Sequence, residues 1–143
     1  MRKSDSKRRG ARSRELGAKS GELRALAEFR FQNLEIWKRS VELAPRLFDT
    51  ADNLQDKGLR RFAEQLRGAA LSIPNNIAEG AGSDSNREFK QFLNFARRSV
   101  FEVANMLFIF AERKLVEREQ QAVLTGELEE LSRMITGFRR SLK

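Results

Sequence analysis

The sequence predicts an all-α protein, an antiparallel up-down-up-down four-helix bundle with a disordered basic N-terminal arm. Two observations predict the bundle. Apolar residues recur at alternating steps of three and four along four long stretches, the spacing of amphipathic helices that pack together. Short polar links join these stretches, which favours antiparallel neighbours. A third observation excludes a sheet, since no stretch of useful length alternates apolar and polar residues with a period of two.

The composition limits the possible classes of function. The chain has 143 residues, enough for one domain with its own core. It contains no Cys and no His, so disulfides and thiol chemistry are excluded and the commonest metal ligand and general base is missing. We therefore expect a protein that is not an enzyme, with no catalytic residue, metal site or cofactor. No apolar run approaches the roughly 18 residues that span a bilayer, and we expect a cytoplasmic protein without membrane contact.

The charge is concentrated at the N-terminus. The formal net charge is +8 and the sequence pI is about 10.6, a balance that favours an acidic partner such as nucleic acid. The predicted arm, residues 1–21, holds two acidic and eight basic residues among Ser and Gly, with few large apolar side chains. The basic residues are Arg2, Lys3, Lys7, Arg8, Arg9, Arg12, Arg14 and Lys19. One interpretation is a nucleic-acid-binding arm; the alternatives are a solvated tail, an extension from a wrongly chosen start or, in a eukaryote, a transit peptide.

The bundle domain is expected at residues 22–143, and its first helix at residues 33–54. Asn33 is of the residue type that caps helix N-termini. The first apolar row has the spacing of a bundle seam and comprises Leu34, Trp37, Val41, Ala44, Phe48 and Ala51. The second row comprises Ile36, Leu43, Leu47 and Leu54. Two rows predict two neighbouring helices, and we interpret Trp37 as a core residue. Pro45 should kink this helix or divide it.

Helix two is expected at residues 59–79, after a turn that uses the permissive backbone of Gly58. Its apolar stripe comprises Leu59, Phe62, Leu66, Ala69, Ile73 and Ile77. Because the stripe continues past Pro74, we interpret the segment as one helix, kinked at the proline and ending at Gly80 or Gly82. Two short helices with a turn between them are the alternative.

Helix three is expected at residues 86–113, with Ser85 and Glu88 as a capping box. Its core stripe comprises Phe89, Phe92, Leu93, Ala96, Val100, Val103, Leu107 and Phe110. Further apolar residues lie outside that stripe, namely Phe95, Phe101, Phe108 and Ile109. A helix that is apolar nearly all round must be covered on several sides, so we predict a subunit interface there. Glu102 is expected to be a buried or interface carboxylate that pairs with an Arg.

Five arginines of helices two and three extend the candidate nucleic-acid surface: Arg60, Arg61, Arg67, Arg97 and Arg98. A solvated helix face is the alternative interpretation of these residues. Helix four is expected at residues 117–142, with a stripe of Leu124, Leu128, Leu131, Ile135, Phe138 and Leu142. The basic residues Arg139, Arg140 and Lys143 suit the dipole at its C-terminus.

An ordered set of motifs carries a resemblance to a known family. The most specific motif is Ser72-Ile73-Pro74 followed by Asn76-Ile77-Ala78-Glu79-Gly80. It lies between Leu34-Glu35-Ile36-Trp37-Lys38 and the set Glu88-Phe89, Phe92-Leu93, Ala96, Ser99 and Glu102. With these motifs the chain resembles the 23S rRNA intervening-sequence protein family from about Phe31 to Val116. It departs from the family pattern at Arg98, where a Gly is usual, and around Lys114-Leu115, which replace a frequent Gly-Tyr-Leu.

The resemblance implies a bacterial four-helix bundle that assembles as a ring-shaped homopentamer and has no catalytic residues. It also implies kinship with the accessory variability proteins of diversity-generating retroelements, which are basic and work with a reverse transcriptase and nucleic acid. We therefore expect an oligomer that binds nucleic acid, RNA more than DNA, by electrostatic attraction. The alternative is a structural or adaptor oligomer whose partner is another protein, such as a reverse transcriptase.

Overall fold

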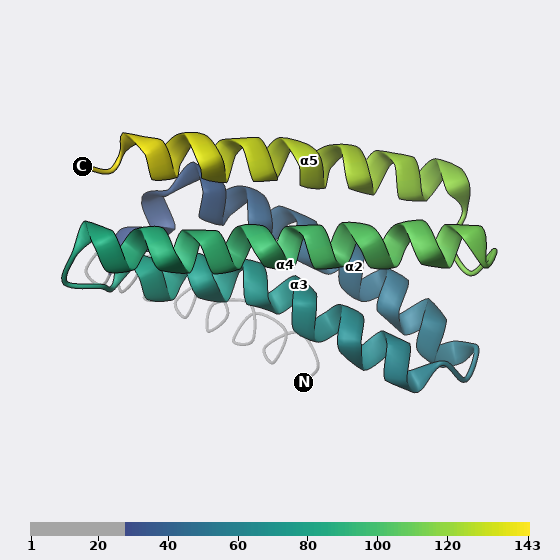
Figure 1. Cartoon of the computed structure of the whole chain (residues 1–143). Coiled ribbons are helices and arrows are strands. Elements are labelled where there is room, and N and C mark those ends of the chain that lie inside the picture. The colour runs from purple at the N-terminus through teal and green to yellow at the C-terminus, as the bar shows by residue number, and fades with distance from the viewer. Residues whose placement is uncertain (1–27) are drawn as a thin grey trace, which may run out of the picture.

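The computed structural model describes residues 28–143, which form a 3₁₀ helix followed by four α-helices (Figure 1). The elements are η1 (Arg30–Asn33), α2 (Glu35–Asp56), α3 (Arg60–Ala81), α4 (Asn86–Glu112) and α5 (Arg118–Ser141). Each α-helix runs antiparallel to the one before it, so the predicted all-α four-helix bundle is confirmed. The predicted arm, residues 1–21, lies outside the described residues.

The helix boundaries agree with the sequence prediction to within two residues, and the N-cap of α2 differs from the predicted one. Asn33 was expected to cap this helix, but it ends η1, and Leu34 occupies the N-cap position without a side-chain cap. Asn33 is therefore one residue too far upstream to receive the first free amides of α2. Pro45 and Pro74 both lie inside uninterrupted α-helices, so neither proline divides its segment and the alternative of two short helices is wrong. One half of the predicted capping box of α4 forms, since Ser85 Oγ accepts a hydrogen bond from the amide of Glu88 at 3.2 Å.

The core lies between the four α-helices, and its deepest side chains come from all of them. The largest fully buried residues are Phe89, Leu47, Leu54, Leu66, Ile73, Ile77, Leu93, Leu107, Leu124, Leu128, Leu131 and Ile135. In α2 the second predicted row is more deeply buried than the first. All of its members are buried, whereas Val41 of the first row is 39% exposed. Ser40 and Thr50 complete the buried row by donating hydrogen bonds to the carbonyls of Trp37 and Arg46. The apolar members of this row were predicted from the sequence, whereas its two polar members were not.

Helices α3 and α4 approach each other closely along small residues. A Cβ placed on Gly80 would lie 2.7 Å from Cδ2 of Phe89 and 2.8 Å from Cβ of Phe92. Further along, the hydroxyl oxygens of Ser72 and Ser99 are 2.8 Å apart and share a hydrogen bond. The family-like motif on α3 therefore supplies the small and polar residues that let this pair of helices pack.

Two turns of the bundle share one backbone motif. After α2, the amide of Gly58 donates to the carbonyl of Gln55, and the amide of Leu59 donates to that of Leu54. Gly58 has a φ of 80°, the left-handed conformation that this C-cap requires. After α4 the same two bonds form, and the left-handed residue there is Lys114, with a φ of 58°.

Replacing Lys114 with Gly should stabilise the fold. A non-glycine residue in the left-handed region costs about 1–2 kcal/mol, whereas Gly adopts it freely but loses more entropy on folding. We expect a net gain of about 0.5–1 kcal/mol, measured as a higher Tm in thermal unfolding followed by circular dichroism. Gly58→Ala, at the equivalent position of the other turn, should lower Tm. An unchanged or lower Tm for the Lys114 variant would contradict the assignment of strain.

None of the helices between residues 28 and 143 is both long enough and apolar enough to cross a membrane.

Candidate nucleic-acid and subunit interfaces

The predicted arginines of α3 do not gather into one basic surface. Arg60 Nε lies 3.0 Å from a carboxylate oxygen of Glu64, one turn along the same helix. Arg67 Nη2 lies 2.6 Å from a carboxylate oxygen of Asp52 on α2. Arg61 is exposed and forms no ion pair with any residue from 28 to 143. Two of the three predicted phosphate contacts are thus already partnered by acidic side chains.

The predicted arginines of α4 lie about two turns or more from those of α3 along the bundle. Arg97 Nε donates a hydrogen bond to the hydroxyl of Ser132 on α5 at 3.3 Å, and its guanidinium lies 5.1 Å from the centre of the Phe101 ring. Arg98 is exposed beside Ser99, which is bonded to Ser72. Ser72 is eleven residues beyond Arg61, a rise of about 16 Å along α3. The five helical arginines therefore do not form one contiguous site.

A basic cluster that the sequence did not assign to function lies at one end of the bundle. We call this the η1 end, because η1, the first turn of α4 and the last turns of α5 lie at this same end of the bundle (Figure 1). Arg139 Nε donates to the carbonyl of Lys90 at 3.1 Å, and the side-chain amide of Asn86 donates to the carbonyl of Lys143 at 3.1 Å. These bonds hold the end of α5 against the start of α4. The basic tract of the η1 end comprises Arg87, Lys90, Arg139, Arg140 and Lys143.

The members of the basic tract are among the cations of the described chain that form no ion pair. Along the seam between α2 and α5, Arg39 pairs with Glu130 at 2.8 Å and Arg46 pairs with Glu127. In contrast, no member of the basic tract forms an ion pair with an acidic side chain of the described chain. The cations at the end of α5 lie where they interact favourably with the helix dipole. Their charges can also attract an anionic partner, because no acidic side chain pairs with them.

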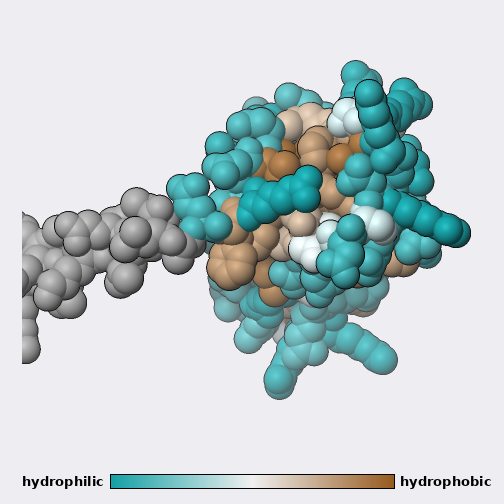
Figure 2. Space-filling view, turned by 90° about the vertical axis from the view of Figure 1, so that its left-hand side faces the viewer, coloured by the Kyte–Doolittle hydropathy of each residue, from teal (hydrophilic) through white to brown (hydrophobic). Residues whose placement is uncertain are grey.

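Aromatic side chains adjoin the basic tract at the same end. The rings of Phe29 and Phe31 are stacked, with centroids 5.5 Å apart and planes 14° apart. The Phe31 ring in turn lies 5.1 Å from that of Trp37, which is half-buried against the core as predicted. The Arg30 guanidinium lies 5.8 Å from the centre of the buried Phe89 ring. Seen end-on, this part of the molecule shows apolar atoms surrounded by hydrophilic side chains (Figure 2).

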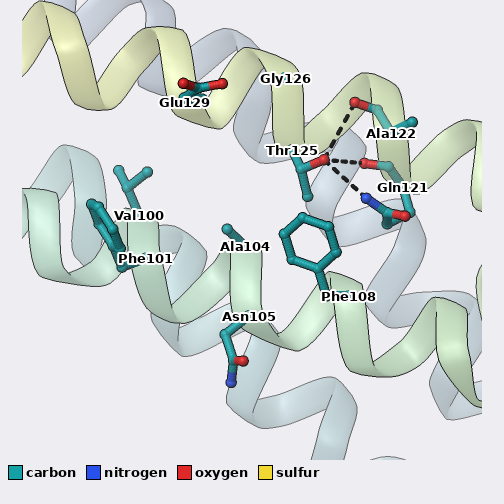
Figure 3. A pocket seen from close by; sticks show the side chains of 10 residues that line it. All are labelled: Val100, Phe101, Ala104, Asn105, Phe108, Gln121, Ala122, Thr125, Gly126 and Glu129. Atoms are coloured by element: carbon teal, nitrogen blue, oxygen red, sulfur yellow. Dashed lines mark hydrogen bonds between the residues drawn. The ribbon is translucent and has the colours of Figure 1, made fainter.

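An apolar groove runs between the outer sides of α4 and α5, and two of the predicted interface residues line it (Figure 3). Phe101 and Phe108, 58% and 56% exposed, project from α4. Across from them α5 contributes small residues, Ala122 and Gly126, where a Cβ on the glycine would meet nothing within 4 Å. The groove encloses about 570 Å³. It is open to solvent, apolar and two helical turns long, which suits it to receive a side-chain row from another chain.

The other predicted interface residues lie on the opposite flank of α4, beside α3. Phe95 is 45% exposed and lines a polar hollow that also includes Glu102. Ile109 is 50% exposed and lies near the α4–α5 turn. The expected burial of Glu102 within the bundle is wrong: the residue is exposed and has no Arg partner among residues 28–143. It lies about 100° round the helix from Val103, and the small residues of α3 opposite it leave its carboxylate in solvent.

Acidic residues do not assemble a metal-binding cluster in the described part of the chain. No group of three or more Asp or Glu side chains there is placed to hold a metal ion.

The comparisons with known proteins give one family model and one similar fold. The family model described as 23S rRNA-intervening sequence protein matches residues 32–137, which include most of α5 as well as the motif-bearing helices. Among solved structures, the chain is similar to a protein of unknown function from the S23 ribosomal protein family of Bacteroides thetaiotaomicron. The TM-score is 0.70 at 20% sequence identity, and the match covers 74% of this chain and 99% of that one, which shows a shared fold. Among curated proteins, no sequence matches the chain.

Proposed function

The chain belongs to the family of 23S rRNA-intervening sequence proteins, and on that premise we propose that it is a non-enzymatic, oligomeric, cytoplasmic protein that binds nucleic acid, RNA in preference to DNA. Binding is electrostatic, through the arm and the basic tract of the η1 end. Cations without acidic partners can neutralise phosphates, and this releases the counterions that the nucleic acid holds. The observation that carries the proposal is the coincidence of these two basic elements. The described chain begins at the end of the bundle where the unpaired cations of α4 and α5 gather.

The proposed oligomer is a ring of five identical subunits, a homopentamer. Two features of α4 support it: exposed apolar residues lie on both flanks of the helix, and the two flanks differ in character. The flank beside α5 is the apolar groove of Phe101 and Phe108, whereas the flank beside α3 presents Phe95, Ile109 and the free carboxylate of Glu102. A closed ring uses two different patches on each subunit, one meeting the other, whereas a two-fold dimer uses one patch twice.

The second candidate function is that of an adaptor whose partner is another protein, such as a reverse transcriptase. The apolar groove favours it, since a partner helix with a row of apolar side chains fits such a surface. Under this hypothesis binding is insensitive to salt and depends on Phe101 or Phe95, and the arm plays no part.

Affinity for RNA and DNA, measured against salt, tests the first function. The proteins are the full chain and a form that lacks residues 1–21, each titrated into labelled single strands by fluorescence anisotropy. We expect the logarithm of affinity to fall linearly with the logarithm of salt, at about −0.7 per neutralised phosphate. If all eight basic residues of the arm engage, their removal should make the slope shallower by up to about 5.6.

Two further outcomes separate the contributions of the arm and the bundle. Binding retained by the shortened form, and lost on reversal of charge at Lys90 and Arg140, assigns the contact to the basic tract. Absence of binding by both forms at low salt contradicts nucleic-acid binding and leaves the adaptor function in its place.

A further inference from the structure

We infer that Phe29 is a stacking platform for an unpaired base, so that the η1 end binds single-stranded nucleic acid rather than duplex. This inference rests on the proposed function and adds to it the class of strand that is bound. Electrostatic attraction alone does not distinguish single strands from duplexes, because both carry phosphates. Discrimination needs a contact that only an unstacked base can make.

The geometry of the aromatic row gives Phe29 one occupied face and one free face. Its ring is stacked nearly parallel on Phe31, and Phe31 packs in turn on Trp37 of α2. Phe29 nevertheless remains 67% exposed, the highest value among the exposed large apolar side chains of the described residues. The inner partner fixes the orientation of the ring while its outer face meets solvent, which is the arrangement that a base needs in order to extend the stack.

The backbone around Phe29 is held in place before any ligand arrives. The amide of Phe29 donates a hydrogen bond to the side-chain carbonyl of Gln32 at 2.7 Å, which closes the first turn of η1. The amide of Gln32 donates back to the carbonyl of Phe29 at 3.0 Å. A platform whose backbone is already ordered loses little entropy when a base stacks on it.

One cation adjoins the platform in the sequence, and others lie further across the same end of the bundle. Arg30 is the next residue, and its guanidinium lies over Phe89, whose ring is also 5.5 Å from that of Phe138 on α5. Arg139, the residue after Phe138, belongs to the basic tract. Phosphates of a strand that crosses the η1 end therefore meet cations from η1, α4 and α5, while one base stacks on Phe29. Aromatic residues among basic ones are the recurring arrangement of single-strand binding surfaces.

The test compares single strands with duplexes at one fixed salt concentration. The probes are a labelled oligouridine of about 12 nucleotides and an RNA duplex of the same length. The proteins are the full chain, Phe29→Ala, Phe29→Tyr and Phe62→Ala; Phe62 is also an exposed aromatic, 43% accessible, but lies near the opposite end beside Phe110. Loss of one stacked base should weaken oligouridine binding about 5- to 150-fold in Phe29→Ala and leave duplex binding unchanged.

The controls separate the platform from the wider proposal. Phe29→Tyr should bind as the unaltered chain does because its ring still stacks, and so should Phe62→Ala. If Phe29→Ala binds as tightly as the full chain, the platform is overturned but electrostatic binding is not. The same holds if Phe29→Ala loses affinity equally for the single strand and the duplex. If the full chain binds neither probe, the proposed function itself fails.

Discussion

Replacing Phe101 and Phe108 together with Glu should convert the proposed oligomer into monomers of about 16.5 kDa. Each ring is more than half exposed in the single bundle, so the substitutions leave the core intact. In the proposed ring the same positions are covered, and an unpaired carboxylate buried against an apolar groove costs several kcal/mol. Two such charges per interface are comparable in free energy with the affinity that a contact of ordinary size provides. Size-exclusion chromatography with light scattering gives the mass directly.

Leu71→Glu is the matched control for this prediction. Leu71 is 45% exposed on α3 and does not line the groove between α4 and α5, so its replacement should leave the mass unchanged. Circular dichroism should show the same helix content for all the variants. An oligomer that survives the double substitution excludes the groove as the subunit contact, and a monomeric unaltered chain contradicts the ring.

Gly80→Ala should destabilise the bundle although alanine is the better helix former. The added methyl group would lie 2.7 Å from the Phe89 ring and 2.8 Å from Cβ of Phe92. Phe89 is only 2% exposed, so it has no room to move aside without pushing α3 and α4 apart. Overpacking of this kind costs about 1–3 kcal/mol, which corresponds to a fall of several degrees in Tm.

Gly68→Ala, in the same helix, should instead stabilise the bundle. A Cβ at Gly68 meets nothing within 4 Å, so only the gain in helix propensity remains, about 0.5–1 kcal/mol. The two Gly→Ala variants should therefore move Tm in opposite directions in thermal unfolding. Two increases would show that α3 and α4 separate easily at this point, contrary to the close approach described above.

The helices were predictable from the sequence because their signal is periodic and repeated. The stripe of α5, for example, is buried from Leu124 to Ile135 as its spacing predicts. Exposure of Phe101 and Phe108 was also predictable, since both positions lie off the core stripe of α4. The continuity of α3 through Pro74 followed from the apolar residues on either side of it.

Other features depend on tertiary contacts or backbone angles that no local pattern contains. Ser40 and Thr50 were not predicted to join the buried row of α2, because hydroxyls that are satisfied on their own helix leave no apolar signal in the sequence. The left-handed turn at Lys114 lacks its usual Gly, which removes the sequence signal. The basic tract was missed because Lys90 and Arg139, 49 residues apart, meet only when α5 folds back along α4.

The start of the described chain, the start of α4 and the C-terminus lie at one end of the bundle, which has a consequence for how strongly a ring would hold a strand. Subunits related by a rotation axis present the η1 end in the same direction relative to that axis. A strand that touches one copy then meets the others at high effective concentration. Such multivalency strengthens binding by about 10²- to 10⁴-fold without any new contact. Loss of assembly alone should thus lower the avidity for long strands, although neither Phe101 nor Phe108 touches a phosphate.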